Sequence, residues 1–234
     1  MVKELRRRLG PAYALQPERF RDQRVLILGP ARTLEEDLAG LEPARYDLFV
    51  RMNNGLDTPV PALGADALRC DVLFHSLTEE ARPVTAELLR GAGVRLLVHR
   101  TPTRGAFLHT LIASERYAAC AAVRHIPCET YIELTRMLSG ACPTTGLICA
   151  RFLLRAPVRE LAIAGFTFFS TRYMPGYDDA VACDVSALSR VAAKGHHDPR
   201  RESALLAEEI AQARGVGKTV TLGRNVLRAM QGEP

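Results

Sequence analysis

Short apolar segments that alternate with helical patterns are the feature that most constrains the fold of this chain. The segments with the length and composition of buried strands are residues 25–28, 48–50, 72–74, 96–98, a short stretch near Val123, 161–164 and 220–222. Helical patterns separate them, near residues 83–90, 106–117, 129–138, 146–155 and 199–213, with one more helix opened by a capping box of Thr33 and Glu36. This alternation predicts an α/β fold: a single Rossmann-like domain with a mostly parallel sheet and helices on both faces.

The length and polarity of the chain agree with one domain. Its 234 residues, 47% of them apolar, suffice for one sizeable α/β domain and are few for two. We expect residues 1–23 to form an N-terminal helical extension and residues 24–234 to form the domain itself. No apolar segment approaches the ~20 residues that cross a bilayer, and the charged N-terminus lacks the apolar stretch of a secretory signal. We therefore expect a cytoplasmic protein, and a bacterial one.

Charge and cysteine content narrow the classes of ligand. The formal net charge is +5, which suits an anionic ligand or an anionic membrane surface. A nucleic acid is not the expected partner, because Trp is absent and no Lys/Arg stripe is interleaved with aromatic residues. The six cysteines form no C-x-x-C pair and no cluster of zinc-binding spacing. We expect buried thiols and predict neither a metal nor a cofactor.

The loops beyond the carboxyl ends of the strands carry the first candidates, because ligands bind there in parallel sheets. Gly29 and Pro30 follow the first strand, where a glycine lets a ligand approach the backbone and the next helix offers N–H groups to a phosphate. The later glycines of G-x-G-x-x-G are absent, which disfavours a dinucleotide site, and Gly29 fits a plain turn equally well. Asn53 follows the second strand; its amide suits a ribose or a phosphate, but Asn-Gly is also a common turn pair.

Two further segments place hydrogen-bond donors at a predicted helix start and after a predicted strand. Their candidate residues are Thr144, Thr145, Gly146, Gly165, Phe166, Tyr173 and Tyr177. The hydroxyl and amide groups that open the helix at 146–155 can bind an anion, and they can also form an ordinary N-cap. The two tyrosines of the long loop 165–180 can donate hydrogen bonds to a phosphate leaving group, and they can equally pack the loop.

A histidine precedes the last long helix. Asp198 is expected as its N-cap and Pro199 as its first residue. Glu202 begins a helix face that continues with apolar residues at four-residue spacing, so we expect it to be partly buried, where its carboxylate can orient or charge-stabilise an imidazole. His197 lies just outside the helix, where it can reach into a cleft or remain solvated.

In this order, the segments resemble the sialyltransferases of glycosyltransferase family 29 and, more distantly, the bacterial sialyltransferases of family 42. The resembling parts are residues 25–29 and 48–53 for the large sialylmotif, 143–147 and 163–166 for the small one, Tyr173 and Tyr177 for the third, and His197 with Glu202 for the H-x4-E of the last. The resemblance covers residues 24–210. It implies a variant of the GT-A nucleotide-sugar glycosyltransferase fold that works without a metal, and the chain has no D-x-D motif.

The resemblance also implies a reaction. The donor would be a cytidine monophosphate (CMP) ester of a 2-keto sugar acid, either sialic acid or 3-deoxy-manno-octulosonic acid (Kdo). The acceptor would be a hydroxyl of a glycan or glycolipid. Because such acceptors are often lipid-linked, a peripheral contact with the inner face of the membrane stays open, as does the oligomeric state.

Each candidate residue receives a role from the resemblance. The donor site would comprise Gly29, Pro30, Asn53, Thr144, Thr145, Gly146, Gly165, Phe166, Tyr173 and Tyr177. Asn53 would contact the nucleotide, residues 144–146 would hold the sugar carboxylate or the cytidine, and the tyrosines would face the phosphate. His197 would be the general base of an inverting displacement, with Glu202 beside it. Pro30 departs from the family, which commonly has Asn at this place.

Two other classes of protein stay open. A nucleotide-binding module without transferase activity is supported by Pro30 and by the compact chain, which leaves little material for an acceptor lid. An enzyme with another donor, such as a methyltransferase or a dehydrogenase, could use a similar sheet. The missing glycine fingerprint argues against the dehydrogenase.

Overall fold

The computed structural model describes residues 2–78, 82–101, 103–178, 180–181, 183–184, 186–187, 189 and 195–232, with nothing stated of the Arg104 side chain. Its sheet has the strand order β5-β4-β3-β2-β1-β6-β7, and every neighbouring pair is parallel. The strands are β1 (Arg24–Leu28), β2 (Leu48–Met52), β3 (Val72–His75), β4 (Leu96–His99), β5 (Ala122–His125), β6 (Glu160–Ala164) and β7 (Thr219–Leu222). The predicted parallel α/β sheet is thus confirmed.

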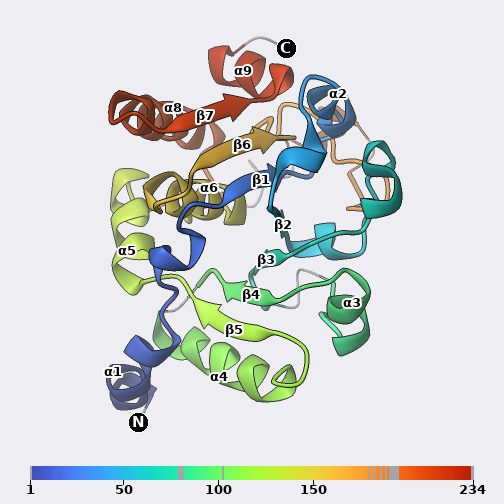
Figure 1. Ribbon diagram of the computed structural model, residues 1–234. Helices are drawn as coiled ribbons and strands as arrows, with labels where there is room; N and C mark the ends of the chain where they lie inside the picture. The colour runs from blue at the N-terminus through green and yellow to red at the C-terminus, as the bar shows by residue number, and fades with distance from the viewer. Residues whose placement is uncertain are drawn as a thin grey trace.

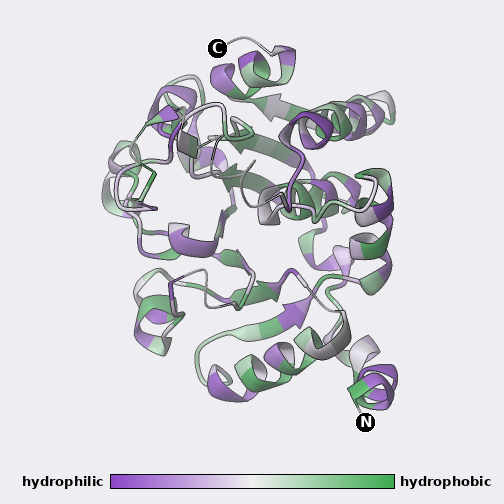
Figure 2. Ribbon diagram, turned by 180° about the vertical axis from the view of Figure 1, so that it is seen from behind, coloured by the Kyte–Doolittle hydropathy of each residue, from purple (hydrophilic) through white to green (hydrophobic). Residues whose placement is uncertain are grey.

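Helices cover both faces of the sheet, as predicted (Figure 1). On one face lie α2 (Leu34–Leu38), α3 (Ala86–Gly91) and α4 (Phe107–Arg116). The other face packs against α5 (Cys128–Met137), α6 (Thr145–Arg155) and α8 (Pro199–Gly215). The central strands are mostly hydrophobic, whereas the surrounding helices carry hydrophilic residues as well (Figure 2). This burial of apolar strands between two helical layers is the main source of stability.

The two ends of the chain lie at opposite edges of the sheet (Figure 1). Helix α1 (Val2–Tyr13) contacts α4 and β5, within the segment expected as an N-terminal extension. That segment also supplies Leu15 and Phe20 to the largest core cluster, where both are 1% exposed. Helix α9 (Arg224–Gln231) contacts α2, α8 and β6. Short 3-10 turns occupy Pro17–Phe20, Pro43–Arg45, Asn53–Leu56, Pro61–Asp66 and Arg104–Ala106.

The predicted capping box at Thr33 is wrong. Thr33 stands at the N-cap position of α2, but its side chain accepts no capping hydrogen bond. Glu36 instead accepts a hydrogen bond from the Asn225 side chain, 3.2 Å away at the start of α9. The next residue, Asp37, is 1% exposed and accepts the main-chain N–H groups of Gly165 and Asn225. The acidic residues of α2 therefore join α9 and the end of β6 to this helix.

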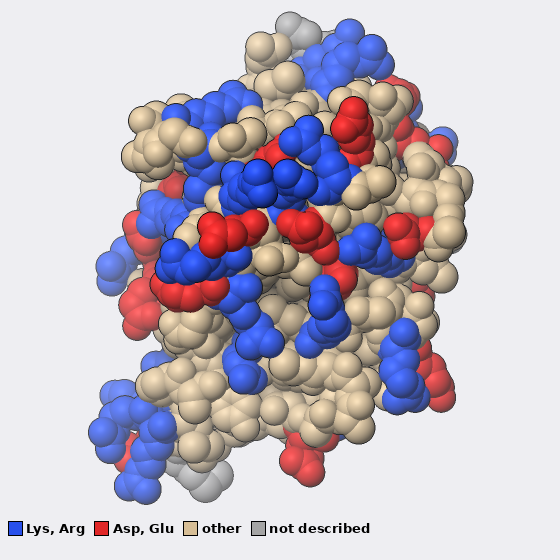
Figure 3. Space-filling view, viewed as in Figure 1, with Lys and Arg blue, Asp and Glu red and all other residues tan. Residues whose placement is uncertain are grey.

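The surface is charged and mixed in sign. Figure 3 shows Lys and Arg side chains beside Asp and Glu across the middle of one face. Within the part of the chain that the structure describes, no helix combines the length and the apolarity that crossing a bilayer requires.

Candidate active site

A pocket of about 260 Å³ opens at the carboxyl ends of the strands. Its walls come from the segments that follow β1, β2, β3, β4 and β6, and from the starts of α6 and α8. The predicted site residues on these walls are Pro30, Asn53, Thr144, Thr145, Gly146, Gly165, Phe166, Tyr173, Tyr177, His197 and Glu202. The fold thus gathers nearly all the candidates around one cavity, at the position where parallel sheets bind ligands.

Gly29 has a structural role beneath the pocket and is not on its wall. A Cβ at this position would lie 2.2 Å from the Gly165 main-chain oxygen and 2.5 Å from the Phe166 ring. The Gly29 N–H donates to the Ala164 oxygen, at 2.8 Å, where β1 and β6 end side by side. The glycine is required by this close approach of two backbones, and its place in the donor site stays a prediction.

Asn53, which follows β2, forms hydrogen bonds with three other walls of the pocket. Its backbone has a φ of +45°, in the left-handed region that Asn tolerates better than most residues. Its Nδ2 donates to Thr145 Oγ1 at 3.2 Å, and its Oδ1 accepts the Ser76 N–H at 3.1 Å. The side chain also forms a hydrogen bond with Tyr177. Asn53 therefore holds together the ends of β2 and β3, the start of α6, and the loop after β6 that contains Tyr173 and Tyr177, called the tyrosine loop below.

The start of α6 is held by a buried carboxylate. Thr144 is the N-cap, and its Oγ1 accepts the Leu147 N–H at 3.2 Å, which settles the choice between the two threonines. Glu202, 2% exposed, accepts both the Thr144 N–H at 2.9 Å and the Thr144 hydroxyl at 2.5 Å. The predicted N-cap of α8, Asp198, is also confirmed, since it accepts the Arg201 N–H. Glu202 thus couples the starts of two neighbouring helices, α6 and α8, that both line the pocket.

Burial raises the pKa of Glu202 to about 7, although its hydrogen bonds from Thr144 lower it in part. Between pH 4.5 and 7 the unfolded chain has lost this proton while the folded chain keeps it. The contribution of Glu202 to the stability of the fold therefore falls as pH rises through this window, by up to roughly 3 kcal/mol.

The variant Glu202→Gln is expected to lose this pH dependence, because an amide can accept the Thr144 N–H and donate to its hydroxyl without titrating. Urea unfolding of both proteins at pH 5 and pH 8 measures the effect. We expect the wild type to lose stability relative to the variant between the two values. Parallel stabilities at both pH values would contradict the raised pKa.

His197 is held as the tautomer that carries its proton on Nδ1. Its Nδ1 lies 2.6 Å from the Cys142 main-chain oxygen. Since a carbonyl oxygen only accepts, this bond places a proton on Nδ1, and the neutral ring then carries its lone pair on Nε2. Glu202 Oε1 is 3.9 Å from Nδ1, an ion-pair distance but too long for a hydrogen bond. The imidazole is thus oriented by Cys142, and Glu202 supplies a neighbouring carboxylate.

Aromatic rings line the side of the pocket formed by residues 166–177. The rings of Tyr173 and Tyr177 lie 4.9 Å apart, and the Phe169 ring contacts both Tyr173 and His197. Burial raises the pKa of Tyr177, so its hydroxyl stays protonated and able to donate. Phe168 and Phe169 have φ values of +50° and +65°, a strained conformation for aromatic residues that is common at functional sites.

Solved sialyltransferase structures share this fold. A mammalian sialyltransferase, in complex with Gal-beta-1-3GalNAc-ortho-nitrophenol, matches with a TM-score of 0.50 and 18% identity, over 87% of this chain and 70% of its own. The sialyltransferase CstII from Campylobacter jejuni, in complex with cytidine-5'-monophosphate, matches with a TM-score of 0.51 and 12% identity, over 90% of this chain and 84% of its own. The chain has the sialyltransferase fold.

No protein-family model matches the sequence, and no curated protein matches it. The sialyltransferase likeness is therefore one of fold at low identity. Among the described residues, no group of three or more His, Cys, Asp or Glu side chains is placed to hold a metal ion.

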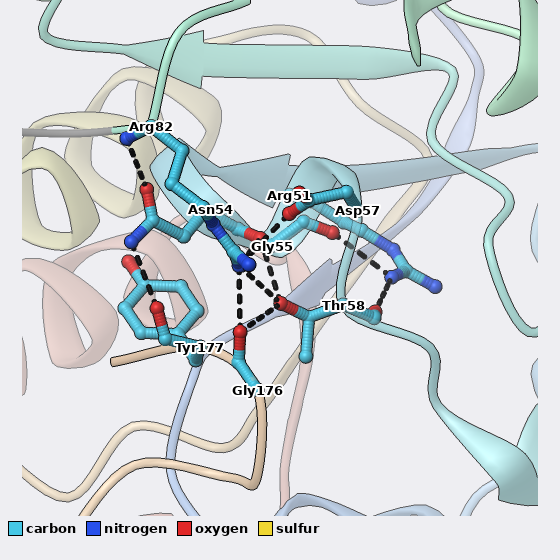
Figure 4. Close-up of polar contacts among 8 residues, drawn as sticks. All are labelled: Arg51, Asn54, Gly55, Asp57, Thr58, Arg82, Gly176 and Tyr177. Atoms are coloured by element: carbon cyan, nitrogen blue, oxygen red, sulfur yellow. Dashed lines mark hydrogen bonds and ion pairs between the residues drawn. The ribbon is translucent and has the colours of Figure 1, made fainter. Parts of the chain in front are cut away.

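A network of polar contacts beside the pocket involves side chains to which the sequence assigned no role (Figure 4). Asn54 Nδ2 donates to the Tyr177 main-chain oxygen at 2.8 Å, and Asn54 Oδ1 accepts the Arg82 N–H at 2.8 Å. The Arg82 guanidinium donates to the Gly176 oxygen at 2.7 Å. Arg51 is 1% exposed and donates to the Gly55, Thr58 and Ala67 oxygens. The bonds of Asn54 and Arg82 hold the loop after β2 against the tyrosine loop, and those of Arg51 fix the segment after β2 itself.

Proposed function

We propose that this protein is a metal-independent, inverting glycosyltransferase that moves a 2-keto sugar acid, sialic acid or Kdo, from a CMP-sugar to a hydroxyl of a glycan or glycolipid. The single observation that carries the proposal is His197, held by Cys142 as a Nδ1-protonated imidazole on the wall of a pocket that also contains Tyr173 and Tyr177. The fold supports the proposal, and we take it to be a variant of GT-A. The two solved neighbours add support, because one binds a glycan and the other binds CMP.

The reaction in this proposal is a single displacement at the anomeric carbon. The acceptor oxygen forms a bond to that carbon while His197 Nε2 takes its proton. The bond from the carbon to the phosphate oxygen breaks, and its electron pair leaves with CMP. The hydroxyls of Tyr173 and Tyr177 stabilise the charge on the phosphate, and residues 144–146 at the start of α6 hold the sugar carboxylate or the cytidine. Asn53 contacts the nucleotide, and residues 30, 165 and 166 complete the donor site.

The setting of the reaction is also part of the proposal. Residues 24–234 form the catalytic domain, and residues 1–23 are its N-terminal extension. We place the protein in the bacterial cytoplasm, where the net charge of +5 favours a peripheral contact with the anionic inner face of the membrane when the acceptor is a glycolipid.

CMP is expected to stabilise the fold, because a ligand that binds only the folded state adds to its stability. At about 100 times its dissociation constant, CMP should add roughly 2.7 kcal/mol, which appears as a higher melting temperature. Uridine monophosphate and uridine diphosphate are the controls. A shift with uridine diphosphate and none with CMP would show that the donor class is wrong.

A further inference from the structure

Arg100 stands out among the charged residues of the pocket. It follows β4 directly, and its N–H donates to the His75 oxygen at the end of β3. Of the described residues that line the pocket, it is the one Lys or Arg. The acidic residues among them are Asp178 and Glu202. A pocket for a CMP-sugar acid must accept two negative charges, one on the phosphate and one on the sugar carboxylate. Arg100 is therefore the side chain with the charge that this ligand requires.

The guanidinium of Arg100 is positioned at the start of the 143–146 segment. Its Nη1 donates to the Pro143 oxygen at 2.9 Å, which is its one hydrogen bond from the side chain to any described residue. Its Nε is buried and has no acceptor in the part of the chain that the structure describes. A guanidinium has five N–H groups in a planar fork that fits a carboxylate, so most of its donor capacity remains for a ligand.

The two anion-binding groups approach the pocket from opposite sides. Tyr173 pairs with Ala31, which follows β1, whereas Arg100 follows β4, and β2 and β3 lie between these strands. The proposed phosphate contacts are on the tyrosine side. The head of Arg100 lies instead beside the N-terminus of α6, where Thr144 and Thr145 line the pocket. The second anionic group of the donor is the one that can reach this corner.

We propose that Arg100 binds the carboxylate of the transferred sugar acid and so selects 2-keto sugar acids over neutral sugars. The inference rests on the proposed function, because it assigns a group of the same donor. It explains an arginine that bonds one carbonyl and still faces the ligand pocket. It also divides the donor between two subsites, with the phosphate at the tyrosines and the carboxylate between Arg100 and the start of α6.

The test is equilibrium binding to the wild type, Arg100→Gln and Arg100→Lys. The probes are CMP, CMP-sialic acid and CMP-Kdo, without an acceptor, and CMP-sialic acid methyl ester, which lacks the negative charge. We expect Arg100→Gln to bind CMP within about threefold of the wild type. Its affinity for whichever donor the wild type binds should fall roughly 30-fold, the usual worth of a hydrogen bond to a charged group. Arg100→Lys should recover part of this loss, and Arg100→Gln should not distinguish the ester from the acid.

The possible contrary results are distinct. If Arg100→Gln loses the same factor of affinity for CMP and for the CMP-sugars, Arg100 either binds the phosphate or only holds residue 143 in place. That result would overturn this inference and leave the proposed function standing. Unchanged donor affinity in the variant would do the same. If Arg100→Gln fails to fold, the wild type still decides, because equal affinities for the acid and its methyl ester would overturn the carboxylate contact. A wild type that binds neither CMP nor a CMP-sugar would overturn the proposed function itself.

Discussion

His197→Ala should reduce the rate of sugar transfer by at least about 100-fold while CMP still binds. The imidazole is the proposed acceptor of the proton from the attacking hydroxyl, and general-base catalysis typically contributes ~100- to 10,000-fold. CMP binding should survive, because Nδ1 is engaged with the Cys142 carbonyl and the proposed nucleotide contacts come from other residues. The measurements are kcat from CMP release and the CMP dissociation constant. The wild type should also show an ascending limb in its pH–rate profile that the variant lacks.

His196→Ala is the matched control for this variant. His196 is adjacent and also lines the pocket, but it contributes a main-chain hydrogen bond, in which its oxygen accepts the Cys142 N–H at 2.8 Å. Replacement by Ala keeps that bond, so we expect most of the activity to remain. An inactive His196→Ala together with an active His197→Ala would show that the base is His196 and that our assignment is wrong. Full activity in both variants would remove this segment from the reaction.

Gly29→Ala should destabilise the protein by about 3 kcal/mol or more. The new Cβ would lie 2.2 Å from the Gly165 oxygen, which is a backbone atom and cannot turn away as a side chain can. Relief requires the ends of β1 and β6 to separate, which costs the Gly29–Ala164 hydrogen bond and the packing around it. The free energy of unfolding in urea measures the loss. Because these strand ends carry Pro30 and Gly165 on the pocket wall, CMP affinity should fall as well.

Gly91→Ala is the control for the glycine substitution. Gly91 lies in α3, and a Cβ there would have no heavy atom within 4 Å outside its own neighbours. Alanine favours a helix over glycine by up to about 1 kcal/mol, so this variant should be as stable as the wild type or slightly more stable. If Gly29→Ala is equally stable, the close approach of β1 and β6 is not a constraint on the fold.

The sheet could be predicted from the sequence because its strands are buried on both faces and therefore apolar. Because the prediction used apolar residues alone, the predicted strands are shorter than the observed ones. The polar residues His75, His99 and Glu160 lie at strand ends and are buried. Helix α9 is short and begins without a side-chain cap, so it had no clear start signal. The order of the strands depends on long-range pairing that no local pattern contains.

The candidate site was predictable where a residue is adjacent in sequence to a strand end or a helix start. The contacts that organise it were not, because they join residues far apart in the chain. Glu202 and Thr144 are separated by 58 positions, and Glu202 bonds that threonine more closely than it approaches His197. Arg100 is one of 31 Lys and Arg residues and has no motif around it. Only its position beside the 143–146 segment distinguishes it.

The most direct test of the central claim is a donor panel with release of the free nucleotide as the readout. The purified chain is incubated in a chelator with glycan acceptors and, in turn, CMP-sialic acid, CMP-Kdo and several uridine- and guanosine-diphosphate sugars. We predict release of CMP from one or both CMP-sugars, at a rate that the chelator does not change, and no release from the others. Release from diphosphate sugars alone, or release that vanishes with the chelator and returns with manganese, would contradict the account. CMP binding with no release from either CMP-sugar would also contradict it, and would favour a nucleotide-binding module.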